Sequence, residues 1–318
     1  MYIAQAYKGN NASWRVILTT IVATGFLALS FVAFLFTSPE DMQKTYDMMK
    51  SLPSIVGLLL NLGPFVFLLV ILILMVIFVH QRSFLSLTTA RPKIDFYRIF
   101  FSAFLIIGLT VFLFAISYYL EPQEIVWNFN PGKFALLFVV SLLLFPFQIG
   151  YEEYLFRGYL MQQIGILFRN RWFPLLLTSV LFGVLHSANP EVAEMGYITM
   201  VFYIGFGLLM GVMTLMDDGL ELALGFHLGN NLLAALLVTS DWSALQTDAL
   251  FKYTAENASE GAVQEMLFSV GLTFPIILFV LAKKYKWTNW KERLTGKVPS
   301  KEIFLAQHSD ETTLPENP

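Results

Sequence analysis

Ionisable and amide side chains interrupt three otherwise apolar stretches of the sequence. In chain order, they are Glu152, Glu153, Arg157, His186, His227 and Asn231. Such side chains are costly in apolar surroundings, so each one is a functional candidate. Carboxylates and imidazoles can activate a water molecule, and amides and imidazoles can stabilise the oxyanion formed at a peptide carbonyl. Together, these residue types indicate hydrolysis.

The two glutamates follow directly on an apolar run, and the apolar pattern continues beyond them. We therefore expect one helix from about Phe134 to Phe168, with the acids near its middle. Glu153 and Arg157 are four residues apart and can pair on one face, whereas Glu152 points about 100° away. The alternative is a helix that ends at Tyr151, with an interfacial Glu–Arg pair that only sets register.

His186 ends a second apolar run. Phe182 lies one turn before it, so an aromatic ring is expected to pack behind the imidazole and limit its rotamers. The alternative is a hydrogen-bonded structural histidine near a helix end.

His227 and Asn231 lie four residues apart within a third apolar run and share one helix face. Gly225 and Gly229 leave room for another helix to approach closely. The pair can belong to a catalytic pocket, or it can serve only as a polar contact between helices. His80, at the end of an earlier apolar run, is interpreted as incidental.

The composition places these residues in a bilayer. Of the 318 residues, 56% are hydrophobic and only 14% are charged, whereas about 25% of the residues of a soluble domain are charged. The net charge of −3 offers no basic surface for nucleic acid. Cysteine is absent, which excludes disulfides, thiolate ligands and a catalytic thiol.

Eight uncharged apolar runs are long enough to cross about 30 Å of hydrocarbon. They are Val16–Phe36, Leu52–Val79, Ile99–Leu120, Phe134–Tyr151, Trp172–Ser187, Met195–Met216, Leu222–Ser240 and Met266–Ala282. The predicted fold is therefore an all-α polytopic membrane protein, with about eight transmembrane helices in one bundle around an intramembrane polar pocket.

The cationic residues favour one orientation of this bundle. With both termini cytoplasmic, the only lysines and arginines outside are Lys44, Lys50, Lys133 and Lys252, as the positive-inside rule requires. By helical rise, Glu153 and His186 then lie roughly 22 Å and 21 Å from the cytoplasmic end of their runs, and His227 roughly 12 Å. Three helices can thus converge on one pocket in a multi-pass protein of the cell membrane.

The chain is predicted to divide into four segments: N-terminal helices in 1–133, a catalytic helical core in 134–240, the last loop and helix in 241–290, and a cytoplasmic tail in 291–318. Lys283–Arg293 interleaves cations with Trp287 and Trp290, which indicates contact with anionic lipid headgroups or a stop-transfer cluster. From Gly296 onward the sequence loses apolar periodicity and is predicted to be disordered.

Several protease designs are excluded by their missing motifs. The sequence has no His-Glu-x-x-His, no serine elbow of the Gly-x-Ser-x-Gly type and no Gly-x-Gly-Asp. Instead, Glu152-Glu153-x-x-x-Arg157, Phe182-x-x-x-His186 and His227-x-x-x-Asn231 occur in this order on apolar helices. This set resembles the CAAX protease and bacteriocin-processing family of intramembrane peptidases, which includes the type II CAAX prenyl endopeptidases. The resemblance covers about Phe134–Ser240.

The resemblance implies an intramembrane endopeptidase acting on membrane-associated peptides, prenylated or not. Glu152 and His186 would activate water, Glu153 would pair with Arg157, and His227 and Asn231 would form the oxyanion pocket. The glutamate could act unaided, or Glu152, His186 and His227 could bind Zn²⁺ with one position open for water, as in a metalloprotease.

Two other functions compete with this one. The first is a catalytically silent immunity or scaffold protein, and the presence of every motif residue argues against it. The second is a small proton-coupled transporter, which would be expected to show inverted repeats and broken helices. The expected partners are membrane lipid and a peptide or protein substrate.

Overall fold

A computed structural model describes residues 1–241, 243–253 and 258–309. Six helical segments of this part are long and apolar enough to cross a membrane. They are α1 (Ser13–Phe36), α3 (Ser54–Leu74) with the π-helical turn Met75–Val79, α5 (Phe96–Leu120), α6 (Pro131–Glu153) with the turn Tyr154–Leu160 and α7 (Met161–Phe168), α10 (Met200–Asp217), and α12 (Ala258–Phe268) with the turn Ser269–Thr273 and α13 (Phe274–Tyr285). The prediction of an all-α polytopic membrane protein is confirmed.

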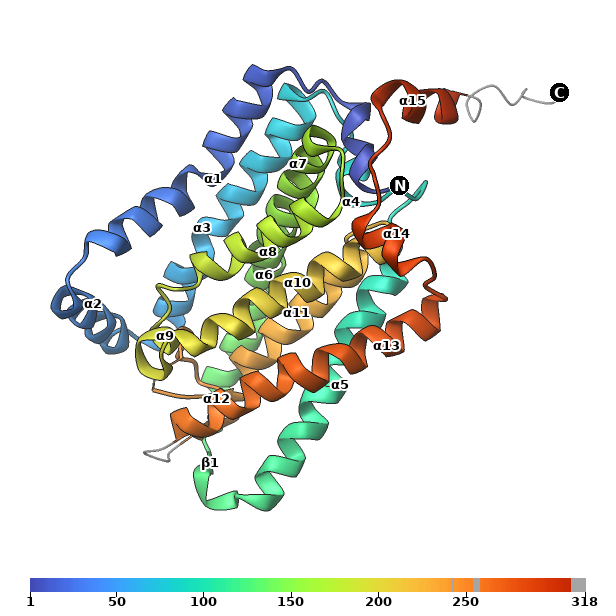
Figure 1. The fold of residues 1–318 in the computed structure, drawn as a ribbon. Coiled ribbons are helices and arrows are strands. Elements are labelled where there is room, and N and C mark those ends of the chain that lie inside the picture. Colours follow the sequence, from blue (N-terminus) through green and yellow to red (C-terminus); the bar gives the residue numbers. More distant parts are fainter. Residues whose placement is uncertain (242, 254–257, 310–318) are drawn as a thin grey trace.

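The other two expected spans are shorter helices. α8 (Trp172–Leu185) has 14 residues and α11 (Glu221–Leu236) has 16, fewer than the roughly 20 that a 30 Å hydrocarbon core requires. α11 lies inside the bundle between α5 and α6, whereas α8 packs against α10 on one face and exposes apolar side chains such as Leu176 on another (Figure 1). Their polar ends can therefore lie at membrane depth.

Short elements close the two ends of the bundle. The helices are α2 (Pro39–Ser51), α4 (Phe84–Thr88), α9 (Pro190–Met195), α14 (Trp290–Thr295) and α15 (Lys301–Ser309), with 3₁₀ turns at Ile3–Lys8, Pro122–Glu124 and Tyr197–Thr199. A small sheet joins β1 (Ile125–Trp127), β2 (Val238–Thr239) and β3 (Phe251–Tyr253) in the order β1-β3-β2. β3 is antiparallel to β1 and parallel to β2. The sheet and α9 lie at the end of the bundle opposite to the two termini (Figure 1).

Glycines set the closest helix contacts. A methyl group on Gly225 of α11 would collide with the carbonyl oxygen of Ile99 on α5, and one on Gly229 would lie 2.7 Å from the carbonyl oxygen of Ala103. Gly207 of α10 similarly lies against Ser179 of α8. Small residues allow such close packing where no hydrophobic effect drives helices together in lipid. The close approach predicted for Gly225 and Gly229 is confirmed.

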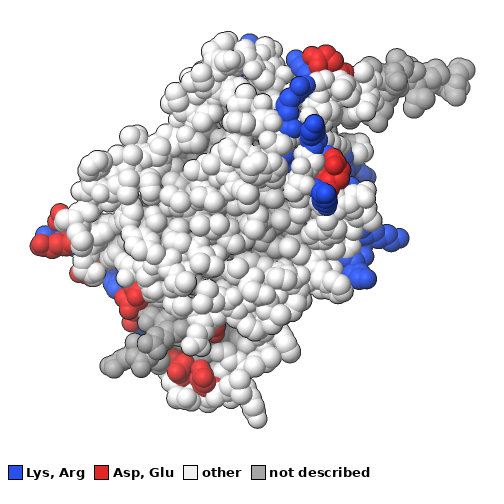
Figure 2. Space-filling view, in the orientation of Figure 1, with Lys and Arg blue, Asp and Glu red and all other residues white. Residues whose placement is uncertain are grey.

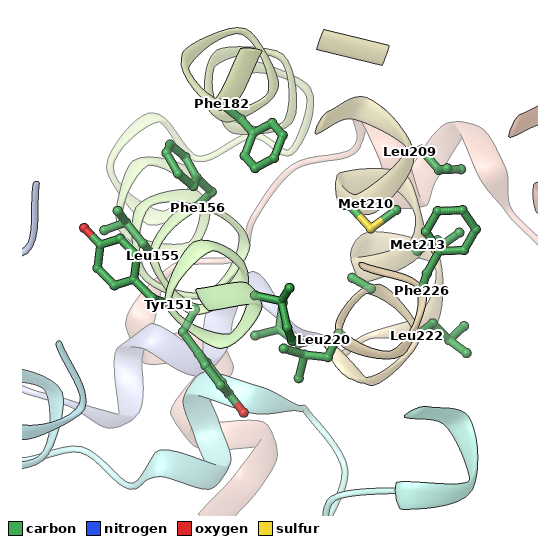
Figure 3. Close-up of a cluster of buried hydrophobic side chains, with 14 of the residues drawn as sticks. Tyr151, Leu155, Phe156, Phe182, Leu209, Met210, Met213, Leu220, Leu222 and Phe226 are labelled. Atoms are coloured by element: carbon green, nitrogen blue, oxygen red, sulfur yellow. The ribbon is translucent and has the colours of Figure 1, made fainter. Parts of the chain in front are cut away.

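One apolar cluster connects the helices that carry the polar residues. Tyr151 and Phe156 from the α6–α7 helix, Phe182 from α8, Met210 from α10 and Phe226 from α11 are each at most 3% exposed. Figure 3 shows these side chains between the helices. Because the packing of a core is dense, it fixes the positions of the polar side chains that the same helices present.

Charged side chains are absent from a broad band on the face drawn in Figure 2, and blue side chains gather near the C-terminal helices. Many large apolar side chains are exposed on the membrane-spanning helices, including Leu29, Phe67 and Phe104, at 67–73% exposure. An exposed apolar band of this kind is what a bilayer covers.

The two ends of the chain meet at one end of the bundle. Asp218 accepts a hydrogen bond of 2.8 Å from the backbone N–H of Tyr2 and one of 2.9 Å from Arg293. Phe304 of α15 is 1% exposed and packs against Tyr7. The prediction of a disordered tail is therefore wrong for 296–309, because a buried aromatic contact orders a helix that hydropathy alone did not indicate. Residues 310–318 lie outside the described part.

Candidate active site

The helix that carries both glutamates runs without a break from Pro131 to Phe168, as predicted. The alternative of a helix ending at Tyr151 is therefore wrong. A π-helical turn, Tyr154–Leu160, begins directly after the glutamates. Such turns are rare and frequently lie at functional sites. Here the turn contains Arg157 and starts at Tyr154, the residue after Glu153.

Glu153 and Arg157 form the predicted ion pair. Arg157 Nη1 lies 3.0 Å from Glu153 Oε1, and both side chains are 0% exposed. Arg157 Nη2 also donates to the carbonyl oxygen of Gly207, and the guanidinium lies 4.4 Å from the centre of the Phe182 ring. The cation thereby joins the α6–α7 helix to α8 and α10.

His227 bridges the two glutamates. Its Nδ1 lies 2.8 Å from Glu153 Oε1, and its Nε2 lies 3.6 Å from Glu152 Oε2. A carboxylate accepts, so Nδ1 carries the proton in this bond and a neutral imidazole has its lone pair on Nε2. Glu153 thus orients His227 as well as pairing with Arg157.

Only one carboxylate oxygen of Glu152 accepts a hydrogen bond from the described residues. Gln148 Nε2 donates to Glu152 Oε1 over 3.0 Å, and Gln148 Oε1 accepts from Asn231 Nδ2 over 3.2 Å. Glu152 Oε2 is buried and has no hydrogen-bond partner among the described residues. A buried oxygen without a partner is costly unless water or a ligand binds it. This atom is therefore the candidate position for a bound water or ligand.

His186 caps α8 beside this cluster. Its Nδ1 donates to the carbonyl oxygen of Phe182 over 2.7 Å, so a neutral ring leaves Nε2 free to accept. The ring lies 4.5 Å from the Phe182 ring, as predicted, and stacks on Tyr203 at 4.6 Å. Phe182 also lies 6.1 Å from the His227 ring, so one aromatic side chain separates the two imidazoles.

The geometry gives no support to the expected zinc site. Glu152, His186 and His227 have suitable donor atoms, but in the part of the chain that the structure describes no group of three His, Cys, Asp or Glu side chains could hold a metal ion. We therefore derive no step through a metal.

Comparison with known proteins decides the family. A model of Rce1-like type II CAAX prenyl endopeptidases matches residues 131–233. The chain is also 30% identical over 287 residues to the uncharacterized protein YyaK of Bacillus subtilis (strain 168), which covers 88% of this chain and 95% of YyaK. The chain belongs to the Rce1-like family of type II CAAX prenyl endopeptidases. No solved structure matches it significantly.

Membership of the Rce1-like family assigns the chain to the intramembrane CAAX-type proteases, which are hydrolases. All six side chains predicted from the sequence lie in the matched segment. The similarity to YyaK covers 88% of the chain, so it includes sequence outside that segment as well.

Sequence reasoning missed two polar residues, of which Gln148 is half-buried and His80 is buried. Gln148 lies four residues before Glu152, and this spacing was the available signal for a contact. His80 is not incidental: it is 1% exposed, with Nδ1 3.0 Å from the carbonyl oxygen of Asn10 and Nε2 3.1 Å from Tyr159. His80 therefore ties α1 and the segment before it to the helix of the site.

Proposed function

We propose that this Rce1-like chain hydrolyses a peptide bond in membrane-associated peptides with a water molecule that Glu152 deprotonates. The observation that carries the proposal is the unpartnered Glu152 Oε2, which faces His227 Nε2 at 3.6 Å. A water bound to Oε2 would lose its proton to the carboxylate as its oxygen attacks the carbonyl carbon. The glutamate would then deliver that proton to the leaving amine.

The neighbouring side chains have separate roles in this proposal. His186 accepts a hydrogen bond from the water through its free Nε2 and so helps to orient it. Asn231 uses one N–H on Gln148 and has a second N–H for the oxyanion. His227, oriented by Glu153 through Nδ1, completes that pocket when Nε2 also carries a proton and can donate to the oxyanion, and Arg157 neutralises Glu153.

We also propose that the protein lies in the cell membrane with both ends cytoplasmic. Tyr7 Oη donates to the carbonyl oxygen of Pro299, so the two terminal segments share one end of the bundle. The four lysines expected outside belong to elements of the opposite end, in α2, α6 and β3. The proposed partners are therefore membrane lipid and a membrane-associated peptide or protein.

Peptide cleavage by the purified protein tests the activity. Two quenched-fluorescence peptides with the same C-terminal CAAX sequence, one farnesylated and one not, are incubated with the protein in liposomes. We expect cleavage of at least one peptide, its loss in Glu152→Gln, and unchanged cleavage in Glu302→Gln, which alters an exposed glutamate of α15. Full cleavage by Glu152→Gln would refute this assignment of the base.

Two further measurements separate the mechanisms. Glu152→Ala, His186→Ala and the double variant should fall to a similar residual rate, because groups that act at one water are not additive. Asn231→Ala should be milder, with a loss of about 10²–10³ in kcat for one oxyanion donor. Activity that a chelator abolishes and Zn²⁺ restores, together with equal losses in His186→Ala and His227→Ala, would replace the metal-free mechanism.

A further inference from the structure

A cavity of about 650 Å³ opens at the end of the bundle away from the termini. We call it the outer basin and define it by Tyr46 of α2, Gly57 and Asn61 of α3, Ala188 and Asn189 before α9, and Thr239 of β2. Its size lies within the range of ligand-binding cavities in proteins. The basin shares no lining residue with the catalytic cluster around Glu152, so it is a separate feature of the fold.

The lining of the basin combines polar, charged and apolar side chains. Hydroxyl and amide groups recur along the wall, among them those of Thr45, Asn61, Asn128, Ser243 and Gln246. Both signs of charge occur on the wall, and one pair is formed by Lys252 and Asp241 at 2.9 Å. Apolar side chains, among them Leu52 and Leu58, also line the wall. Such a mixed wall suits the backbone and side chains of an extended peptide.

The inner wall of the basin continues into the catalytic cluster. The backbone N–H of Asn189 donates to the carbonyl oxygen of His186 over 3.0 Å. Asn189 Nδ2 donates to Tyr203 Oη over 3.1 Å, and the Tyr203 ring stacks on the imidazole of His186. A substrate peptide that contacts Asn189 would therefore touch a residue that bonds both to the backbone of His186 and to Tyr203.

Helix α2 covers the basin from the opposite side. Tyr46 Oη donates to the carbonyl oxygen of Ala188 over 3.0 Å. α2 is mostly exposed, and none of its residues is buried. The basin thus lies between an exposed helix and the turn that carries His186.

We infer that the outer basin binds an extended segment of the substrate peptide, and that the substrate reaches His186 and Glu152 from the non-cytoplasmic side. This inference rests on the proposed peptidase function. Its side rests on the proposed orientation with both ends cytoplasmic, because the basin lies at the end of the bundle away from the termini. The substrate class is then a membrane-anchored peptide with a hydrophilic extension outside the cell.

A matched pair of glycines on α3 allows a direct test. A Cβ atom on Gly57 or on Gly63 would meet nothing within 4 Å, and only Gly57 lines the basin. The probe is a quenched-fluorescence peptide with one transmembrane segment and a Ser/Asn/Gln-rich extension. We expect Gly57→Trp to raise KM for this peptide at least tenfold and Gly63→Trp to leave it unchanged, with equal thermal unfolding of both variants.

Crosslinking tests the proposed binding of substrate in the basin independently of the proposed peptidase activity. Because the chain has no cysteine, Gly57→Cys and Gly63→Cys can each carry a single photo-crosslinker in a Glu152→Gln background. We expect the same peptide to crosslink at position 57 and not at 63. Crosslinking at 57 without cleavage by the wild type would support the basin and refute the peptidase. Cleavage without crosslinking at 57, or absence of both, would overturn the basin.

The side of the membrane is tested in whole cells. Ala193→Cys places a thiol on an exposed residue of the basin wall. A membrane-impermeant maleimide should label it in intact cells. Labelling only after permeabilisation would overturn approach from outside.

Discussion

Gln148 Nε2 donates a hydrogen bond of 3.0 Å to Glu152 Oε1, and the same amide accepts a hydrogen bond from Asn231. One neutral side chain therefore sets the distance between the proposed base and the proposed oxyanion donor. Since Gln148 is four residues before Glu152 on the same helix, the backbone already places the two side chains on one face.

We expect Gln148→Ala to lower kcat by about 100-fold with little change in KM, because it releases both partners from their reacting positions. Gln148→Asn, whose amide is one methylene shorter, should recover only part of the rate. Steady-state kinetics with the cleaved peptide measures both constants. Gln163→Ala is the control, since Gln163 binds Asn11 at a distance from the site. A change in KM alone would argue against a positioning role.

Arg157→Ala should destabilise the fold by about 3–5 kcal/mol, because it leaves Glu153 as an unpaired buried charge. Arg157→Lys should be intermediate, since lysine keeps the charge and loses the contact geometry with Gly207 and Phe182. Thermal unfolding in detergent and the yield of folded protein measure the effect. Equal unfolding temperatures of wild type and Arg157→Ala would contradict the burial of this pair.

Gly225→Ala should push α11 away from α5 and cost about 1–3 kcal/mol, as overpacking does. Activity should fall with it, because α11 carries His227 and Asn231. The matched substitution is Gly108→Ala on α5, where a Cβ would meet nothing within 4 Å. This control should be neutral or stabilising by roughly 0.5–1 kcal/mol, from helix propensity. A loss in the control equal to that of Gly225→Ala would show that packing is not the cause.

Burial raises the pKa of Glu191 in α9, although the N–H of Ala244 that it binds at 2.8 Å acts in the opposite direction. The folded state therefore takes up this proton at a higher pH than the unfolded state does. Protonation of Glu191 therefore increases the free energy of unfolding as the pH falls through the raised pKa. This contribution is lost as the pH rises again. Unfolding temperatures measured across this range should show the increase in the wild type and not in Glu191→Gln.

The exposed Glu194, three residues further along, gives the control for that titration. Glu194→Gln should keep the pH dependence of the wild type. If Glu191→Gln also keeps it, the titrating group lies elsewhere.

The sequence predicted those parts of the site that follow from helical spacing within one apolar run. Glu153 and Arg157 pair because they are four residues apart, and His227 and Asn231 meet the same helix for the same reason. Gln148 carries no charge, and an amide next to the end of an apolar run did not stand out. The role of His80 depends on Asn10 and Tyr159, which come from distant parts of the chain.

The outer basin could not be predicted from periodicity. Its walls come from α2, α3, the segment before α9 and the residues after β2, which only the tertiary fold brings together. The small sheet has the same origin, because β1 and β3 are more than a hundred residues apart. Hydropathy likewise gave no signal that Phe304 would pack on Tyr7 and order α15.

The double contact of Asp218 has a consequence for how firmly this end of the bundle is closed. Its carboxylate holds both Tyr2 and Arg293, which come from opposite ends of the described chain. Asp218 directly follows α10, whose Gly207 carbonyl binds Arg157. One carboxylate thus fastens two distant segments to the end of α10, so a change at Asp218 would release both segments from this end of the bundle at once.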